Sequence, residues 1–148
     1  MNRMPRLIAI LLLASLLLGT TAGCRSVHQP EHTYVMASLD HMPAAIQSAP
    51  VLVQQAYQFA EANPEVLSQL PCYCGCGAMG HTSNYSCYIS GTDENGRPLY
   101  DTHALGCSIC VDITQDAMRL LNEGQSVSEI LTYVNNTYAR YGPPTPGQ

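Results

Sequence analysis

Apolar residues recur at helical spacing in three parts of the chain, about residues 48–62, 108–122 and 126–142. Ser48 can cap the first helix and Pro50 suits its first turn. Ser126 and Glu129 form the pattern of a capping box at the start of the third. The three apolar stripes are Val53, Ala56, Tyr57 and Ala60; then Cys110, Ile113, Ala117, Leu120 and Leu121; then Val127, Ile130, Leu131, Val134, Tyr138 and Tyr141. The pattern predicts a mainly α fold, a small helical bundle.

The segments between these helices follow other patterns. A short helical turn is expected after Asn63-Pro64, and Pro71 should end it. A cysteine-rich loop follows directly. Residues 83–99 predict irregular structure or a short hairpin, because residues 93–96 (Asp-Glu-Asn-Gly) are typical of a turn.

The N-terminus has the layout of a secretory signal. Arg3 and Arg6 precede an apolar run over residues 7–18, and small residues then lead to Cys24. The run is short for a membrane span, which needs roughly 20 apolar residues. The ending at residues 21–24 (Thr-Ala-Gly-Cys) resembles a bacterial lipobox, which implies cleavage before Cys24 and a lipid such as palmitate on its sulfur. A protein anchored to the extracytoplasmic face of the cell membrane is therefore expected.

The remaining chain divides into three parts on this view. Residues 24–47 contain Pro30 and Pro43 without a sustained apolar period, which predicts a flexible tether. Residues 48–142 form one Cys/His-rich helical domain, and residues 143–148 form a disordered tail.

Removing residues 1–23 takes away two arginines and no acid, so the formal charge falls from −5 to −7. The chain has no lysine, and a basic footprint for nucleic acid is missing.

The cysteines are the most informative residues. Seven are present, and six remain besides Cys24: Cys72, Cys74, Cys76, Cys87, Cys107 and Cys110. Six cysteines in an exported chain ordinarily suggest three disulfides, with fifteen possible pairings. However, adjacent members of a Cys-x-Cys pair make a strained disulfide, because the short ring conflicts with the preferred S–S dihedral angle.

The alternating triplet favours a metal site instead. Thiolates at this spacing can converge on one ion, and Gly75 and Gly77 permit the necessary turns. Soft thiolates bind Cu(I) and zinc, and imidazole suits zinc and copper. The candidate ligands exceed the four of a structural zinc site: Cys72, Cys74, Cys76, His81, Cys87, His103, Cys107 and Cys110. We expect copper(I), with zinc and mercury(II) as alternatives, in a binding protein rather than an enzyme.

Two other functions stay open. Cys107 and Cys110 form a Cys-x-x-Cys pair at a predicted helix start, where the helix N-terminus should lower the thiol pKa values and favour thiol–disulfide exchange. Alternatively, three disulfides make an interaction module that binds no metal. The expected partners are the membrane, a metal ion, and an exported protein that receives the metal or presents a thiol.

Residues 71–76 spell PCYCGC, and the chain here resembles the PCYCGC-motif lipoproteins. Further residues of the chain resemble later landmarks of that family. They are Gly80-His81, Ser83-Asn84, Cys87, His103, the pair Cys107 and Cys110, Asp112, Gly124, Ser126, Ile130 and Tyr138. The resemblance covers about residues 50–141. It implies export and places the cysteines and histidines in one site, without naming an activity.

A looser resemblance concerns the C-terminal part. Residues 107–142, with a Cys-x-x-Cys, a helix, Gly-x-Ser and a second helix, are similar to the helical thiol reductases of cytochrome c maturation. The resemblance implies a reactive pair at Cys107 and Cys110. Such reductases do not need the additional cluster of Cys72, Cys74, Cys76 and Cys87.

Overall fold

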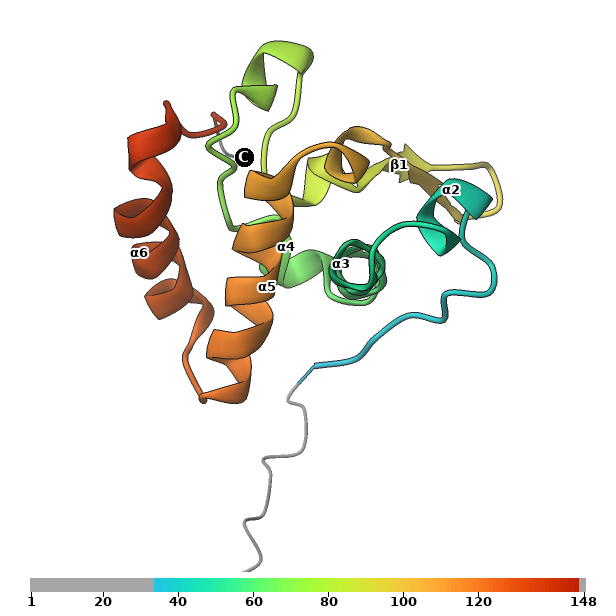
Figure 1. The fold of residues 1–148 in the computed structure, drawn as a ribbon, viewed down its shortest axis with the longest axis horizontal. Coiled ribbons are helices and arrows are strands. Elements are labelled where there is room, and N and C mark those ends of the chain that lie inside the picture. The colour runs from blue at the N-terminus through green and yellow to red at the C-terminus, as the bar shows by residue number, and fades with distance from the viewer. Residues whose placement is uncertain (1–33, 147–148) are drawn as a thin grey trace, which may run out of the picture.

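The computed structural model describes residues 34–146. Figure 1 shows the longer helices below a projecting loop that contains the cysteine-rich segment, with a hairpin at one side. The expected signal peptide (1–23), the lipidation site at Cys24 and the first part of the expected tether lie outside the described residues. Within 34–146, no helix is long and apolar enough to cross a bilayer.

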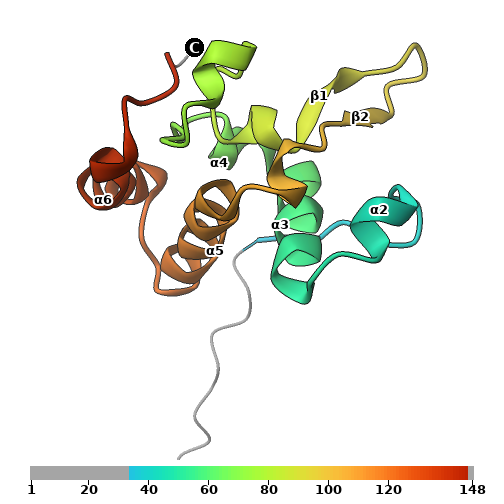
Figure 2. The same cartoon turned by 45° about the horizontal axis from the view of Figure 1, so that its top comes forward.

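Three helices form the framework. They are α3 (Val51–Ala62), α5 (Ser108–Asn122) and α6 (Val127–Tyr138). Helix α5 packs between the other two (Figures 1 and 2). The buried faces follow the apolar periodicity, with Tyr57, Ile113 and Ile130 fully buried at their centres. The prediction of a mainly α domain is confirmed, although α3 begins two residues later than expected, with Pro50 rather than Ser48 at its N-cap.

Local sequence fixes the turn between α5 and α6. Gly124 adopts the left-handed conformation, with φ +83°. Its N–H donates to the Leu121 carbonyl, and the Gln125 N–H donates to the Leu120 carbonyl. This is a Schellman ending, which requires a residue that tolerates positive φ. The predicted capping box between Ser126 and Glu129 is present, so α6 starts directly after the turn.

Short elements connect the framework. They are α2 (Ala44–Gln47), α4 (Pro64–Leu67), the 3-10 turns η1 (Cys76–Met79), η2 (Tyr85–Cys87), η3 (His103–Leu105) and η4 (Ala139–Tyr141), and strands β1 (Ile89–Thr92) and β2 (Pro98–Tyr100). The strands pair in antiparallel fashion, with an irregular register between Ile89 and Gly91. The predicted hairpin is thus present, and it projects away from the helices (Figure 2).

Two expected boundaries differ from the structure. Residues 34–47 pack on the domain instead of forming a flexible tether: Met42 and Ile46 are buried, and the Ala37 N–H donates to the Gln58 carbonyl. The part of the tail that the structure describes, up to residue 146, is not free either, because Thr145 is buried against the cysteine-rich loop. Neither segment has the periodicity that makes burial visible in a sequence.

Candidate metal centre

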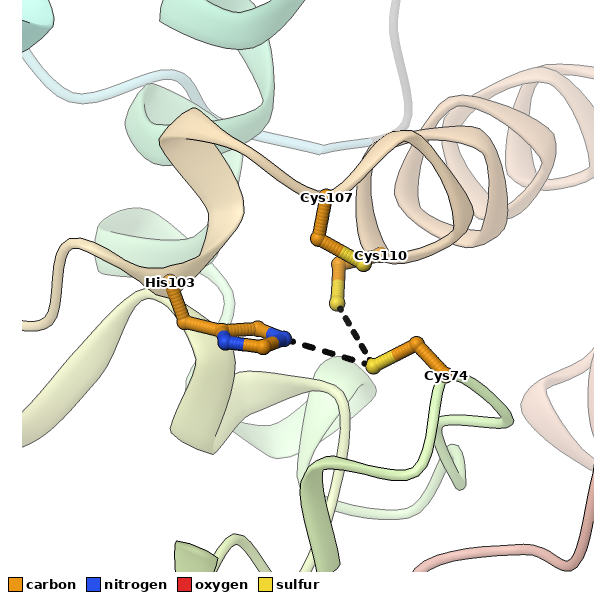
Figure 3. Close-up of side chains that lie close together, drawn as sticks. All are labelled: Cys74, His103, Cys107 and Cys110. Carbon is orange, nitrogen blue, oxygen red and sulfur yellow. Dashed lines mark hydrogen bonds between the residues drawn. The ribbon is translucent and has the colours of Figure 1, made fainter.

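The structure brings all eight predicted ligands together. The loop after Pro71 carries Cys72, Cys74 and Cys76, and the segment that follows carries His81 and Cys87. Turn η3 supplies His103, and the start of α5 supplies Cys107 and Cys110. Figure 3 shows side chains from the loop, η3 and α5 pointing toward one another. Residues separated by up to 38 positions therefore share one cluster.

Glycines shape the loop. Gly75 has φ +84° and Gly80 has φ +92°, so both ends of η1 adopt the left-handed conformation that favours glycine. Gly75 reverses the chain between Cys74 and Cys76. Gly77, the other glycine expected to permit a turn, has no positive φ; a side chain there would instead contact Pro146 of the tail.

The sulfur atoms lie within reach of one another. Cys72 Sγ is 3.4 Å from Cys74 Sγ and 3.3 Å from Cys110 Sγ. Cys74 Sγ is 3.6 Å from Cys110 Sγ, and Cys76 Sγ is 3.6 Å from Cys87 Sγ. All six cysteines of residues 34–146 are free. The separations exceed the roughly 2.05 Å of a disulfide bond.

Four overlapping groups have their ligand atoms within 4.8 Å of one another, and each can hold a metal ion. The groups are Cys74, His103, Cys107 and Cys110; Cys76, His81, Cys87 and His103; Cys72, Cys74 and Cys76; and Cys72, Cys87 and Cys110. Burial varies across them. Cys72, Cys87 and Cys110 are fully buried, whereas Cys74, His103 and Cys107 are half-buried.

The histidines face the thiols. His103 Nε2 is 3.3 Å from Cys74 Sγ (Figure 3), and the His81 and His103 rings meet edge to face with centroids 5.1 Å apart. His81 is buried, and its Nδ1 has no hydrogen-bond partner among the described residues. A buried polar atom without a partner costs about 1–3 kcal/mol. Because His81 belongs to a group with Cys76 and Cys87, the donor set fits a metal ion.

Polar contacts also fix the start of α5, which positions Cys110. The buried Tyr88 hydroxyl donates to the Cys110 carbonyl at 2.8 Å and lies 2.8 Å from the Thr114 hydroxyl. The Asn84 amide donates to the same Thr114 oxygen. The sequence gives no sign of Tyr88 or Thr114, because a tyrosine and a helical threonine have no spacing that marks them as supports.

Asp101 is a second supporting residue that sequence reasoning missed. Its Oδ1 accepts a 2.7 Å hydrogen bond from the His103 N–H, and its Oδ2 lies 3.5 Å from His81 Nε2. Aspartate commonly accepts from the backbone two residues later, so the sequence Asp-x-His was the available sign. Asp101 therefore contacts both imidazole residues of the cluster.

The C-terminal tail supports Cys72. The Cys72 N–H donates to Thr145 Oγ1 at 3.0 Å, and the Thr145 N–H donates to the Cys72 carbonyl at 2.8 Å. Beside it, the Tyr73 hydroxyl donates to Asn135 Oδ1 of α6. The tail and α6 thus hold the first turn of the loop. No pattern in the last six residues indicated this contact.

The thiols differ in how readily they ionise. Hydrogen bonds from Cys110 and Cys87 lower the pKa of Cys72, whereas burial raises the pKa values of Cys74 and Cys76. The expectation for Cys110 was wrong: its hydrogen bond to Cys72 raises the pKa of its thiol despite the helix N-terminus. Ionisation is therefore easier at Cys72 than at the neighbouring thiols. A bound cation would allow more of them to ionise.

The fold and site define a small helical domain built around a buried cysteine–histidine cluster. Its family follows from the sequence comparison: the family model described as "Protein of unknown function with PCYCGC motif" matches residues 15–148. The chain belongs to this family. The match extends beyond residues 50–141, where the resemblance was noted. No curated protein and no solved structure matches the chain.

Proposed function

We propose that the protein binds Cu(I) through the cysteine–histidine cluster and delivers it to, or withholds it from, another exported protein. The convergence of six thiols and two imidazoles in overlapping groups carries this proposal. Thiolate and imidazole are ligands of Cu(I), and the preference of thiolate for soft ions disfavours magnesium and calcium. Zinc and mercury(II) accept the same ligands and are the competing ions.

Half-burial of part of the cluster supports exchange rather than permanent storage. Cys74 and Cys107 are partly exposed, so the thiol of another protein can approach them, while fully buried Cys72 and Cys110 lie behind. Transfer by stepwise ligand exchange needs such an accessible sulfur. A structural zinc site, in contrast, has a closed set of four ligands.

The test is a titration of the reduced chain with Cu(I) in competition with a chelator, without oxygen. We expect ultraviolet charge-transfer absorption and tight binding that Cys74→Ser weakens by more than 10–100-fold, the range for outer supporting residues. The control is Ser128→Ala, at an exposed position of α6 outside the four groups. Unchanged affinity in Cys74→Ser contradicts the proposal.

The membrane anchor is part of the same proposal. Lipid on Cys24 would hold the domain at the extracytoplasmic face of the cell membrane, and more than one acyl chain is needed for stable attachment. Expression with a labelled fatty acid tests it. Label should enter the wild-type chain and its size should fall on cleavage before Cys24, whereas Cys24→Ser should take up none. Label retained in Cys24→Ser contradicts the anchor.

Thiol–disulfide exchange is the second candidate function, favoured by the arrangement of Cys107 and Cys110. Cys107 is accessible at the N-cap of α5, and Cys110 is buried one turn later. The Cys107 thiolate would attack a partner disulfide and release one partner thiolate; Cys110 would then displace the second and close the intramolecular disulfide. Against this role, Cys110 Sγ lies beside Cys72 and Cys74. A Cys110→Ser variant that traps a partner on Cys107 would favour exchange.

A further inference from the structure

We propose that the cluster holds two metal ions in non-equivalent positions, a proposal that rests on the metal-binding function. The rim site consists of Cys74, His103, Cys107 and Cys110, the residues of Figure 3. The inner site consists of Cys76, His81 and Cys87, which form a second group together with His103. With His103 assigned to the rim, the two sets have no residue in common.

The inner site has a thiol pair and an unsatisfied nitrogen. Cys76 Sγ and Cys87 Sγ are 3.6 Å apart, and both side chains are buried. His81 is only 8% exposed, and its Nδ1 has no hydrogen-bond partner among the described residues. Ser83 Oγ and Asn84 Oδ1, nearby in the chain, also lack partners, but neither belongs to a ligand group. An ion held by the two sulfurs would satisfy the buried nitrogen.

Asp101 orients the histidine of the inner site. The other ring nitrogen of His81, Nε2, lies 3.5 Å from Asp101 Oδ2. Metal-binding histidines commonly place a carboxylate on the second ring nitrogen, which fixes the ring and raises its basicity. Asp101 is itself held in place, because its backbone carbonyl accepts from the Tyr57 hydroxyl and its N–H donates to the Tyr88 carbonyl. It is therefore a positioning residue.

The rim site has four candidate ligands of its own, without Asp101 or the residues of the inner site. His103 Nε2 is 3.3 Å from Cys74 Sγ, and Cys110 Sγ is 3.6 Å from the same sulfur. Although His103 is within range of both groups, its contact with Cys74 assigns it to the rim. The set of three thiols and one imidazole is a common one for a tetrahedral ion.

Cys72 lies between the two sites. Its sulfur forms one group with Cys74 and Cys76 and another with Cys87 and Cys110, so each group joins a rim residue to an inner residue. A thiolate has more than one lone pair and can bridge two soft ions. We infer that Cys72 bridges them, which would explain why a sixth cysteine is buried at the centre.

One ligand of the inner site borders an opening. A surface cavity of about 440 Å³ is lined by His81, Asp101 and the exposed Met79, among others. An ion in this cavity can reach His81 without passing the rim. The thioether of Met79 would bind Cu(I) at the opening and has little affinity for harder ions.

Native mass spectrometry of the reduced full chain with Cu(I) and a competing chelator tests the two-site proposal. We expect two ions in the wild type, one in Cys107→Ser and one in His81→Ala. His41→Ala is the matched histidine control, because His41 pairs with Glu61 outside the cluster, and it should keep two ions. Far-ultraviolet circular dichroism checks that each variant is folded. His81→Gln, which keeps a polar group of similar size, replaces His81→Ala if that variant unfolds.

The outcomes separate this proposal from the metal-binding function. A single ion in the wild type, or loss of both ions in either single variant, overturns the two sites and leaves Cu(I) binding standing. Two ions retained in Cys107→Ser or His81→Ala overturns the assignment of ligands. No ion in the reduced wild type overturns both proposals.

The positioning role of Asp101 has a separate readout. Asp101→Asn should keep two ions but weaken the inner one by about 10–100-fold, with the rim affinity unchanged. Nitrogen NMR of labelled histidine should show the His81 Nδ1 resonance shifting on Cu(I) addition in the wild type, and a different tautomer balance in Asp101→Asn before any metal is added. Equal tautomer balance and equal affinities in both chains overturn the role.

Discussion

The helical framework and the loop at residues 71–81 are held by different forces. In the framework, apolar side chains at helical spacing meet in a continuous core, and Phe59, Ile113 and Val134 are fully buried. The loop has no such stripe. Thr145 holds Cys72 and Asn135 holds Tyr73 through hydrogen bonds, and sulfur and imidazole side chains gather beside them. The framework should therefore be stable without metal, whereas the loop should depend on it.

The largest expected effect separates framework stability from metal binding. Ile113→Ala removes a fully buried side chain of α5 and should lower the free energy of unfolding by about 2–5 kcal/mol. Val51→Ala, at an exposed position in α3, should change it by less than about 0.5 kcal/mol. Urea unfolding of the metal-free reduced chain measures both. Equal effects in the two variants would contradict a core-stabilised framework.

Metal should stabilise the loop more than α6. At a free Cu(I) concentration 100 times the dissociation constant, binding stabilises the bound state by about 2.7 kcal/mol, so amides in residues 72–81 should exchange roughly 100-fold more slowly. Amides of α6 that exchange by local opening should keep their rates. Hydrogen exchange with and without Cu(I) measures this. Uniform slowing over the described residues would remove the distinction between the two regions.

Loss of the hydrogen bond between Thr145 and Cys72 should have the next largest effect. Thr145→Val keeps the shape of the side chain but leaves the buried Cys72 N–H without its side-chain acceptor, which costs about 1–3 kcal/mol. Cu(I) affinity should fall with it, because Cys72 begins the loop. Thr132→Val is the control, since that hydroxyl is exposed and donates only to a carbonyl of its own helix. Equal Cu(I) affinities in the two variants would show that the tail does not support the site.

Metal affinity should also rise with pH. Burial raises the pKa values of Cys74 and Cys76, so both thiols carry protons near neutral pH and an incoming ion must displace them. Each displaced proton should raise the affinity about tenfold per pH unit between pH 6 and 8. Zn²⁺ titrations across that range measure the slope. A pH-independent affinity would mean that these thiols are not ligands.

Sequence periodicity predicted the framework well, because apolar spacing reports directly on a helical core. The spacing of cysteines and histidines identified the candidate ligands, since these residues have few roles when clustered. Neither pattern indicated the packed segment at 34–47 or the buried Thr145, because their burial depends on contacts with distant residues. Asp101, Tyr88 and Thr114 were missed for the same reason. Their side chains act on the cluster through contacts that only the folded chain creates.

X-ray absorption at the copper edge of the Cu(I)-loaded reduced chain reports directly whether the cysteine–histidine cluster binds copper. We expect sulfur as the main nearest neighbour, with additional scattering from imidazole, because the site combines thiols with His81 and His103. His81→Ala should reduce the imidazole contribution and leave the sulfur shell. Coordination by oxygen and nitrogen alone would place the metal elsewhere on the protein and rule out the cysteine–histidine cluster as the copper site.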